Sequence, residues 1–286
     1  MKKTTLNKIE LTNLEDYSGI GNSRIGGQPD LPIEMDYPTT EDGFLEFIMQ
    51  INLNDVEIEG LPNLGLLSLF NGNLDKREAK GFYFTESTYL TKKEIPINTK
   101  FAGVVDFHEH TSHKISIIKK EVISMDVELS SDEEYDSRLD SYHNCSYVLG
   151  AGLIDKSELY LRTNGFDLIP YSVRLTSNKQ VNYSGRNANI QYNNIQDLIN
   201  CPVTDYYENM RFPQKATRKE WIDQLKNFEN QKENHLKRFA DYVCLISLES
   251  IHKVGMIWGD LHKLEMYGLE SDFKKNDFSN LNSWLF

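Results

Sequence analysis

The sequence predicts an α+β fold: predominantly antiparallel β-sheets in two repeat-related halves, with a few peripheral helices. Short apolar runs rich in aromatic and β-branched residues recur along the chain, as at 44–53 and 66–70. Turn residues separate the runs, and Asn71-Gly72 directly after one of them is a strong hairpin signal. An amphipathic stretch at 217–239 adds a helix. These three observations together favour strands with a smaller helical part.

A loop rich in glycine and proline, at 23–32, comes before the first predicted strand. Gly26-Gly27 is suited to backbone angles with φ above zero. Two prolines fix their own φ and disfavour helix at the residues before them. The composition therefore predicts a rigid loop rather than a flexible linker. It leads into a buried strand at 44–53, a turn at 61–65 and a second strand at 66–70.

The remaining elements follow from similar patterns. Apolar, β-prone segments at 101–107 and 114–123 predict two more strands. Hydroxyl and carboxylate residues from Ser130 onward predict the start of a helix. Thr217 and Glu220 have the spacing of a capping box, and the residues after them continue a helical apolar stripe.

Two pairs of predicted strands recur at one offset. Segment 47–52 resembles 244–249, and 67–70 resembles 264–267, each shifted by 197 positions (244 − 47 and 264 − 67). Equal spacing within each pair predicts two related β-halves. The alternative is chance similarity, because apolar strands resemble one another in many proteins.

Composition narrows the possible functions. The 286 residues carry a formal net charge of −12, which argues against nucleic acid because its phosphates attract clustered Lys and Arg. No apolar run indicates a signal peptide or a membrane span, so no membrane partner is expected. The three cysteines are far apart and odd in number, which predicts no disulfide framework and favours the reducing cytoplasm.

Several segments resemble the YwqG-like family of bacterial proteins. The resemblance rests on Gly-Gly-Gln-Pro-Asp-Leu-Pro at 26–32, Gln-Ile-Asn-Leu at 50–53, Leu-Pro-Asn-Leu-Gly at 61–65 and Met-Ile-Trp-Gly-Asp at 256–260. That family is a domain of unknown function, so the resemblance implies a fold rather than a chemistry. It implies one domain over 1–286, with family-like segments at about 23–70 and 240–286 and an elaborated middle at about 72–234.

Three histidines form the most metal-like pattern, namely His108, His110 and His113. Imidazoles two residues apart on a strand share one face, and neutral imidazole is a good zinc or copper ligand. The alternative is a solvated polar hairpin between two strands, and we favour it because short motifs of this kind often match without binding a metal. We therefore expect no metal and no cofactor.

A local acidic patch is the best candidate surface for a protein partner. It consists of Asp132, Glu133, Glu134, Asp136 and Asp140. Together with the overall negative charge, it suits a basic partner through complementary electrostatic fields. The alternative is the solvated first turn of a helix.

Two functional hypotheses follow. The first is a non-enzymatic cytoplasmic protein that binds another protein, one form being an immunity or antitoxin-type protein that sequesters a basic toxin. The second is a small-ligand-binding protein or hydrolase-type enzyme with a site between the two β-halves. The residues of that second site would be Arg24, Gln50, Asn52, Trp258 and Asp260. Gln50 and Asn52 share one face of an apolar strand, and the alternative is that they anchor the adjoining loop.

Overall fold

The computed structural model describes residues 3–73, 76–85, 88–96, 110–123, 145–150, 173–175, 181–185, 188–192, 230, 241–258 and 263–285. The chain divides into two compact units, one made of residues 1–152 and 243–286 and the other of residues 153–242. The single domain over 1–286 stays a prediction. The candidate sites discussed below lie in the first unit.

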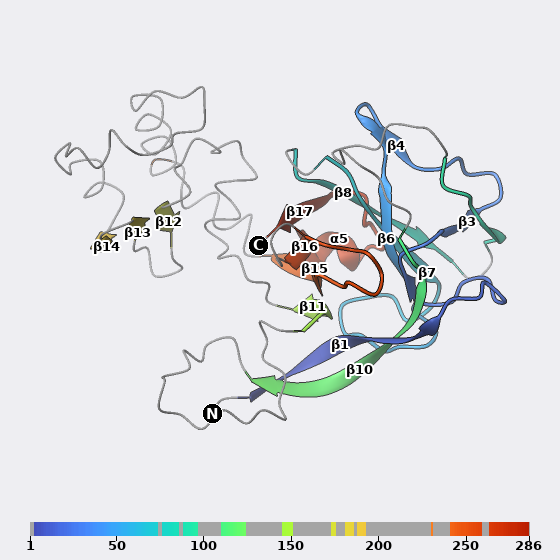
Figure 1. The fold of residues 1–286 in the computed structure, drawn as a ribbon, viewed down its shortest axis with the longest axis horizontal. Coiled ribbons are helices and arrows are strands. Elements are labelled where there is room, and N and C mark those ends of the chain that lie inside the picture. Colours follow the sequence, from blue (N-terminus) through green and yellow to red (C-terminus); the bar gives the residue numbers. More distant parts are fainter. Residues whose placement is uncertain are drawn as a thin grey trace. The chain divides into compact units, whose positions relative to one another are not determined.

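The first unit is built around a closed ten-stranded β-barrel (Figure 1). Its strands are β1 (Lys3–Leu14), β2 (Arg24–Ile25), β6 (Glu46–Asn52), β7 (Leu66–Asn71), β8 (Glu78–Phe84), β10 (His113–Ile123), β11 (Tyr147–Gly150), β15 (Tyr242–Glu249), β16 (Lys263–Leu269) and β17 (Leu281–Leu285). Their order around the barrel is β1-β10-β2-β6-β7-β8-β17-β16-β15-β11, and β11 pairs with β1 to close it.

The predicted α+β class is wrong for the part of the chain that the structure describes, which is nearly all β. The one helix with described bounds there is α5 (Glu270–Phe273), a single turn after β16. None of the described helical residues forms a helix long and apolar enough to cross a membrane. Closure of the sheet into a barrel was not predicted. It depends on pairing between strands far apart in sequence, which local sequence patterns do not encode. The predicted helix at 217–239 lies outside the described residues, apart from Asn230.

The strand order is symmetric about the β1–β10 pair. In one direction the barrel continues through β10, β2, β6, β7 and β8, and in the other through β1, β11, β15, β16 and β17. The two series meet where β8 pairs with β17. The resembling segments occupy equal places, since β6 and β15 are third in each series and β7 and β16 are fourth. This is the order expected if the two halves are related.

The barrel interior is filled by apolar side chains from both series. In β7, Leu67 and Leu69 belong to this core, and in β16, Leu264 and Met266 do. Successive residues of a strand face opposite sides of a sheet. The alternate residues of these two strands, among them Ser68 and Glu265, therefore face away from the barrel interior.

A register shift in β6 sets the direction of Gln50. The pairing of β6 with β7 slips between Phe47 and Met49, as in a β-bulge. Ile48 and Met49 consequently both pack in the barrel core, while Gln50 faces the loop that precedes and follows β2.

A smaller apolar cluster covers the outside of β6 and β7. It contains Leu31, Tyr37, Leu45, Phe47 and Phe70. Leu31 comes from β3 (Asp30–Pro32), which pairs with β9 (Leu90–Lys92). Phe44 of the short β4–β5 hairpin (Thr39–Thr40 and Gly43–Phe44) also packs here. This cluster holds the glycine- and proline-rich loop against the barrel.

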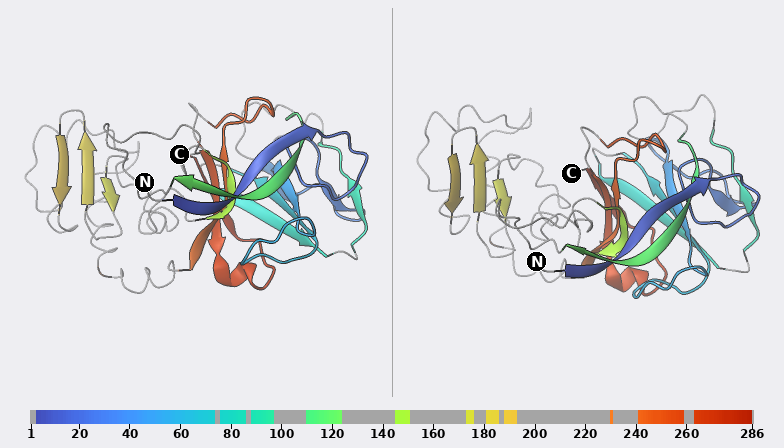
Figure 2. Two further views of the ribbon diagram at one scale, coloured as in Figure 1. Left: turned by 90° about the horizontal axis from the view of Figure 1, so that it is seen from below. Right: turned by 60° about the horizontal axis from the view of Figure 1, so that its bottom comes forward.

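The second unit contains a three-stranded antiparallel sheet among its described residues. Its strands are β12 (Val173–Leu175), β13 (Val181–Gly185) and β14 (Ala188–Tyr192), drawn as neighbouring arrows in Figure 2.

Gly26 and Gly27 adopt the predicted left-handed conformation, with φ of 69° and 70°. A Cβ on Gly27 would collide with the hydroxyl of Tyr17 and with the Ser112 side chain. The predicted rigid loop is confirmed at these two residues, because both the angle and the space exclude a side chain.

The first prediction concerns Gly27→Ala. Backbone strain and the clash together should lower the free energy of unfolding by about 2–4 kcal/mol. The control is Gly21→Ala, whose φ is +83° but whose Cβ would meet no atom within 4 Å, so that only strain of about 1 kcal/mol is expected. Urea denaturation of both variants measures the difference. Equal losses would contradict the close packing at Gly27.

Candidate functional site

A fully buried arginine forms the centre of the first polar site. Arg24 lies in β2, between β10 and β6, where its Cα partners are Lys114 and Gln50. Its side chain has no solvent exposure. Its guanidinium contacts the Asp30 carboxylate, and its Nη1 lies 3.7 Å from Glu15 Oε2. Both carboxylates are buried as well, which is the arrangement that a buried cation requires.

Gln50 and Asp30 tie the loop to the barrel through three hydrogen bonds. The Gln50 amide nitrogen donates to Asp30 Oδ2 at 2.9 Å and to the Asn22 carbonyl at 2.8 Å. The Gln50 amide oxygen accepts from the Asp30 backbone N–H at 2.9 Å. Asp30 Oδ2 also accepts from the Gly21 N–H at 2.7 Å. Gln50 is thus fully used in holding residues 21–30.

Tyr17 stacks beside the buried charges. The centre of its ring lies 4.9 Å from the Arg24 guanidinium carbon and 4.7 Å from the Lys92 ammonium. Cations at this distance from an aromatic face are attracted by its quadrupole. The Tyr17 hydroxyl accepts a hydrogen bond from the Gln28 N–H at 2.9 Å. The ring therefore also fixes the backbone beside Gly27.

Lys114 extends this charge network to the surface. Its ammonium lies 3.0 Å from Asp16 Oδ1 and 3.8 Å from Glu15 Oε1. The hydrogen bond to Asp16 raises the pKa of Lys114. Hydrogen bonds from Ser18 and then from Lys114 hold the pKa of Asp16 well below its usual range. At neutral pH both groups are therefore charged, and they neutralise each other.

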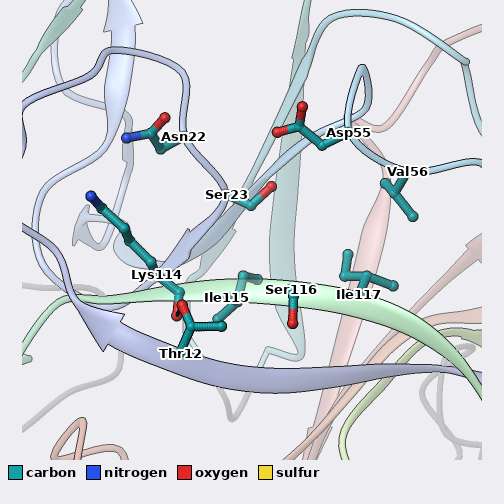
Figure 3. Close-up of a pocket in the computed structure, with 9 residues that line it drawn as sticks. All are labelled: Thr12, Asn22, Ser23, Asp55, Val56, Lys114, Ile115, Ser116 and Ile117. Carbon is teal, nitrogen blue, oxygen red and sulfur yellow. Dashed lines mark hydrogen bonds between the residues drawn. The ribbon is translucent and has the colours of Figure 1, made fainter.

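A pocket of about 340 Å³ opens beside this network (Figure 3). It is lined by Thr12, Asn22, Ser23, Asp55, Val56, Lys114, Ile115, Ser116 and Ile117. In the view of Figure 3, Asn22 and Lys114 lie at one end and Asp55 and Val56 at the other. Ser23 directly precedes Arg24, so the buried charges hold one wall of the pocket in place.

A second pocket, of about 390 Å³, lies across the loop that follows β6. Its lining includes Ile20, Asn52, Asn54 and Tyr89. Four of the eight exposed large hydrophobic residues in the described ranges lie on or next to it, namely Ile20, Ile33, Leu64 and Tyr89. Such a gathering of exposed apolar side chains is typical of an interaction surface.

A separate buried polar cluster lies on β11, β15 and β16. The Tyr147 hydroxyl donates to Glu265 Oε1 at 3.3 Å, and the Tyr267 hydroxyl contacts Glu265 Oε2. The Lys263 ammonium donates to the Cys145 carbonyl at 2.8 Å, and burial lowers the pKa of Lys263. Burial, followed by the nearby Glu265 carboxylate, raises the pKa of the Cys244 thiol well above its ordinary value.

The two polar clusters occupy corresponding places in the two strand series. Arg24 pairs with Gln50 between the second and third strands of one series, and Tyr147 pairs with Ser247 in the other. At the repeat offset of 197 positions, Ser68 of β7 corresponds to Glu265 of β16. Each half of the barrel therefore carries buried polar groups on its outward side, with arginine in one half and tyrosine with glutamate in the other.

The five residues of the predicted ligand site divide into three groups. Arg24 and Gln50 lie together, and the Asn52 N–H joins them by donating to the Ser23 hydroxyl at 2.8 Å. Trp258 packs in the large apolar cluster, which also contains Ile25 and Ile51. Asp260 lies outside the described residues.

The histidine and acidic candidates are placed only in part. His110 Nε2 lies 2.7 Å from Glu46 Oε1, and His113 Nδ1 lies 3.4 Å from the Thr111 carbonyl. His108 and the whole acidic patch (Asp132, Glu133, Glu134, Asp136 and Asp140) lie outside the described residues. Within the residues whose placement is described, no three His, Cys, Asp or Glu side chains are grouped so as to hold a metal ion.

Sequence reasoning missed Glu15, Tyr17 and Asp30. Asp30 stands between two prolines in a loop already recognised as rigid, which was a usable signal. Glu265 was also missed, although it interrupts the apolar run 264–267 in the same way as Gln50 interrupts its own strand. A polar residue inside a buried strand needs a hydrogen-bond partner, and that requirement singles out both Gln50 and Glu265.

The second prediction concerns Gln50→Ala. Losing three hydrogen bonds and leaving a cavity should lower the free energy of unfolding by about 2–4 kcal/mol. Its Cα partner Ser68 provides the control, because its hydroxyl is buried without a hydrogen-bond partner in the described structure. Ser68→Ala should change stability by less than about 1 kcal/mol. Similar losses in both variants, measured by urea denaturation, would refute the anchoring role of Gln50.

The third prediction concerns the Cys244 thiol. Because burial raises its pKa and excludes reagents, the native protein should leave Cys244 unlabelled by iodoacetamide at pH 8. Labelling should appear only when denaturant unfolds the barrel, which peptide mass spectrometry can follow over time. Labelling of native Cys244 at the rate of a free thiol would contradict its burial.

The comparison with protein families gives one match. The family described as "Domain of unknown function (DUF1963)" matches residues 23–285, which is nearly the whole chain. No curated protein matches the chain. The matched range begins at Ser23, directly before Arg24, and ends at Leu285, in the last barrel strand. The chain therefore belongs to the DUF1963 family, a family whose function is unknown.

Proposed function

We propose that this protein binds a small polar molecule in the pocket beside Arg24. The pocket of about 340 Å³ with its hydroxyl, amide and charged lining is the observation that carries the proposal. Its volume is within the range of small-molecule sites. Among the residues that the structure describes, apolar side chains of both strand series fill the barrel core.

Preorganisation supports this choice. Asn22 and Ser23 are held by Gln50 and by the Asn52 N–H, and Lys114 is held by Asp16. A pocket whose groups are already fixed loses little entropy when a ligand binds.

The finer family assignment belongs to the proposal as well. We infer that the chain is a YwqG-like member of its family, on the motifs at 26–32, 50–53 and 61–65. A cytoplasmic location is proposed with it, supported by the free buried thiols of Cys145 and Cys244.

A second candidate function is binding of a basic protein, as in an immunity or antitoxin-type protein that sequesters a toxin. Two observations favour it, the net charge of −12 and the exposed apolar residues around the second pocket. Apolar contact supplies affinity, and complementary charge supplies the rate and the specificity of association.

The fourth prediction tests the small-ligand proposal. Purified protein is mixed with the polar small-molecule fraction of its host cells, and the retained compounds are identified by mass spectrometry. Ser116→Trp should fill the pocket and abolish retention of the bound compound. Ile118→Trp is the matched control, because Ile118 is exposed on the same strand and does not line the pocket. Retention by all three proteins, or by none, would contradict the proposal.

A fifth prediction separates the second candidate from the first. A protein partner should co-purify in equal amount and dissociate at high salt, because exposed charges are screened. Tyr89→Ala should weaken that association, whereas Ser116→Trp should leave it intact. A partner that is retained in high salt and is insensitive to Tyr89→Ala would contradict the proposed surface.

A further inference from the structure

We propose that the pocket beside Arg24 selects molecules that carry an amine or guanidine group on a short apolar chain. This inference rests on the small-ligand function proposed above and names the chemical class of that ligand. It goes against the simplest expectation, since the one cation that lines the pocket is Lys114 and a lysine commonly attracts anions.

Lys114 is already neutralised within the protein. Its ammonium lies 3.0 Å from Asp16 Oδ1 and 3.8 Å from Glu15 Oε1. Arg24, the next cation inward, is enclosed by Glu15 and Asp30. Three carboxylates thus lie around these two cations, and a third cation, Lys92, lies 4.7 Å from the ring of Tyr17 beside Arg24. An anionic ligand would meet no excess positive charge there.

The opposite end presents the Asp55 carboxylate, which has no counter-ion among the described residues. Asp55 lines the pocket and is exposed, and the exposed side chains of Glu57 and Glu59 follow it in the same loop without lining the pocket. Among the residues that the structure describes, none of these three carboxylates forms an ion pair. Their fields add, because like charges within a few residues lie closer together than the screening length at physiological salt. This end therefore favours a positive group.

The lining between the two ends suits the remainder of such a ligand. The hydroxyl groups of Thr12, Ser23 and Ser116 have lone pairs that can accept from an ammonium. Thr12 donates its own hydrogen to the Lys114 carbonyl at 3.0 Å, so its oxygen faces other groups as an acceptor. Val56 and Ile117 contribute an apolar wall on the side of Asp55, which would contact methylene groups.

The test compares three four-carbon probes of nearly equal size: 1,4-diaminobutane, 1,4-butanediol and succinate. Binding to the full chain is followed at fixed ionic strength by calorimetry and by the amide NMR signals of Asp55, Lys114 and Ser116. The inference predicts that only the diamine binds, with shifts confined to the pocket. Asp55→Asn should weaken it about two- to fivefold, the effect of one exposed charge pair.

Two further variants keep the test selective. Glu41→Gln removes one negative charge from the β4–β5 hairpin, where Glu41 pairs with Lys76, and should leave diamine affinity unchanged. Lys114→Met should raise diamine affinity about two- to fivefold, because it releases Asp16 and Glu15 from their cation. A lysine that served as an anion site would give the opposite result, with loss of succinate binding.

The outcomes are distinguishable from those of the parent proposal. Preferential binding of succinate or the diol at the pocket amides would overturn the inference and leave the small-ligand function standing. Diamine binding that is unchanged by Asp55→Asn, or no diamine binding, would also overturn it. The small-ligand function itself is decided by retention from the cell extract and by Ser116→Trp.

Discussion

A guanidinium without solvent exposure constrains everything around it. Removing a charge from water costs several kcal/mol even in relaxed protein surroundings, unless close counter-charges and hydrogen bonds replace the solvent. Arg24 obtains these from Glu15 and Asp30, with the face of Tyr17 beside it. Asp30 in turn needs Gln50 and the Gly21 N–H. The Arg24 side chain therefore fixes the end of β1, the loop 21–32 and β6 relative to one another.

The closed barrel and the polar clusters on its outward side depend on each other. A barrel leaves no unpaired edge, so its interior can be wholly apolar. Polar groups such as Gln50 and Glu265 then face outward, where loops or other side chains must satisfy them. Buried polar groups of this kind stabilise one arrangement only when every partner is present. In the strand series that contains β2 and β6, the need to satisfy these polar groups also positions one wall of the pocket beside Arg24.

Much of the local structure could be predicted from the sequence. The apolar runs at 66–70 and 243–248 predict the strands β7 and β15. The pair Gly26-Gly27 predicts two positive φ angles, which the structure has. The hydrogen bonds of Gln50 agree with the alternative interpretation of this residue, in which it anchors the adjoining loop. The α+β class failed for the described residues, and the segments 130–142 and 217–239, whose patterns predicted the helices, lie outside them apart from Asn230. Closure of the barrel depends on pairs such as Lys8 with Tyr147, far apart in sequence.

The candidate site was predictable only in part, for a physical reason. Arg24 and Gln50 stand out as polar residues in rigid or apolar segments. Glu15 does not, because nothing in its own neighbourhood indicates that β1 brings it beside Arg24. Long-range charge pairing is decided by the fold, and local composition carries no signal of it. The pocket depends on the same pairing, since Lys114 and Ser23 come from segments about 90 residues apart (114 − 23).

The most direct test of this account is a double-mutant cycle on Arg24 and Asp30, using Arg24→Met and Asp30→Asn singly and together. Unfolding free energies from urea denaturation give the coupling between the two side chains. We expect a coupling of at least about 2 kcal/mol, since each single variant leaves its partner buried without its counter-charge. A control cycle of Arg24→Met with Lys76→Met should give additive effects. A coupling near zero between Arg24 and Asp30 would contradict the claim that the buried pair organises the site.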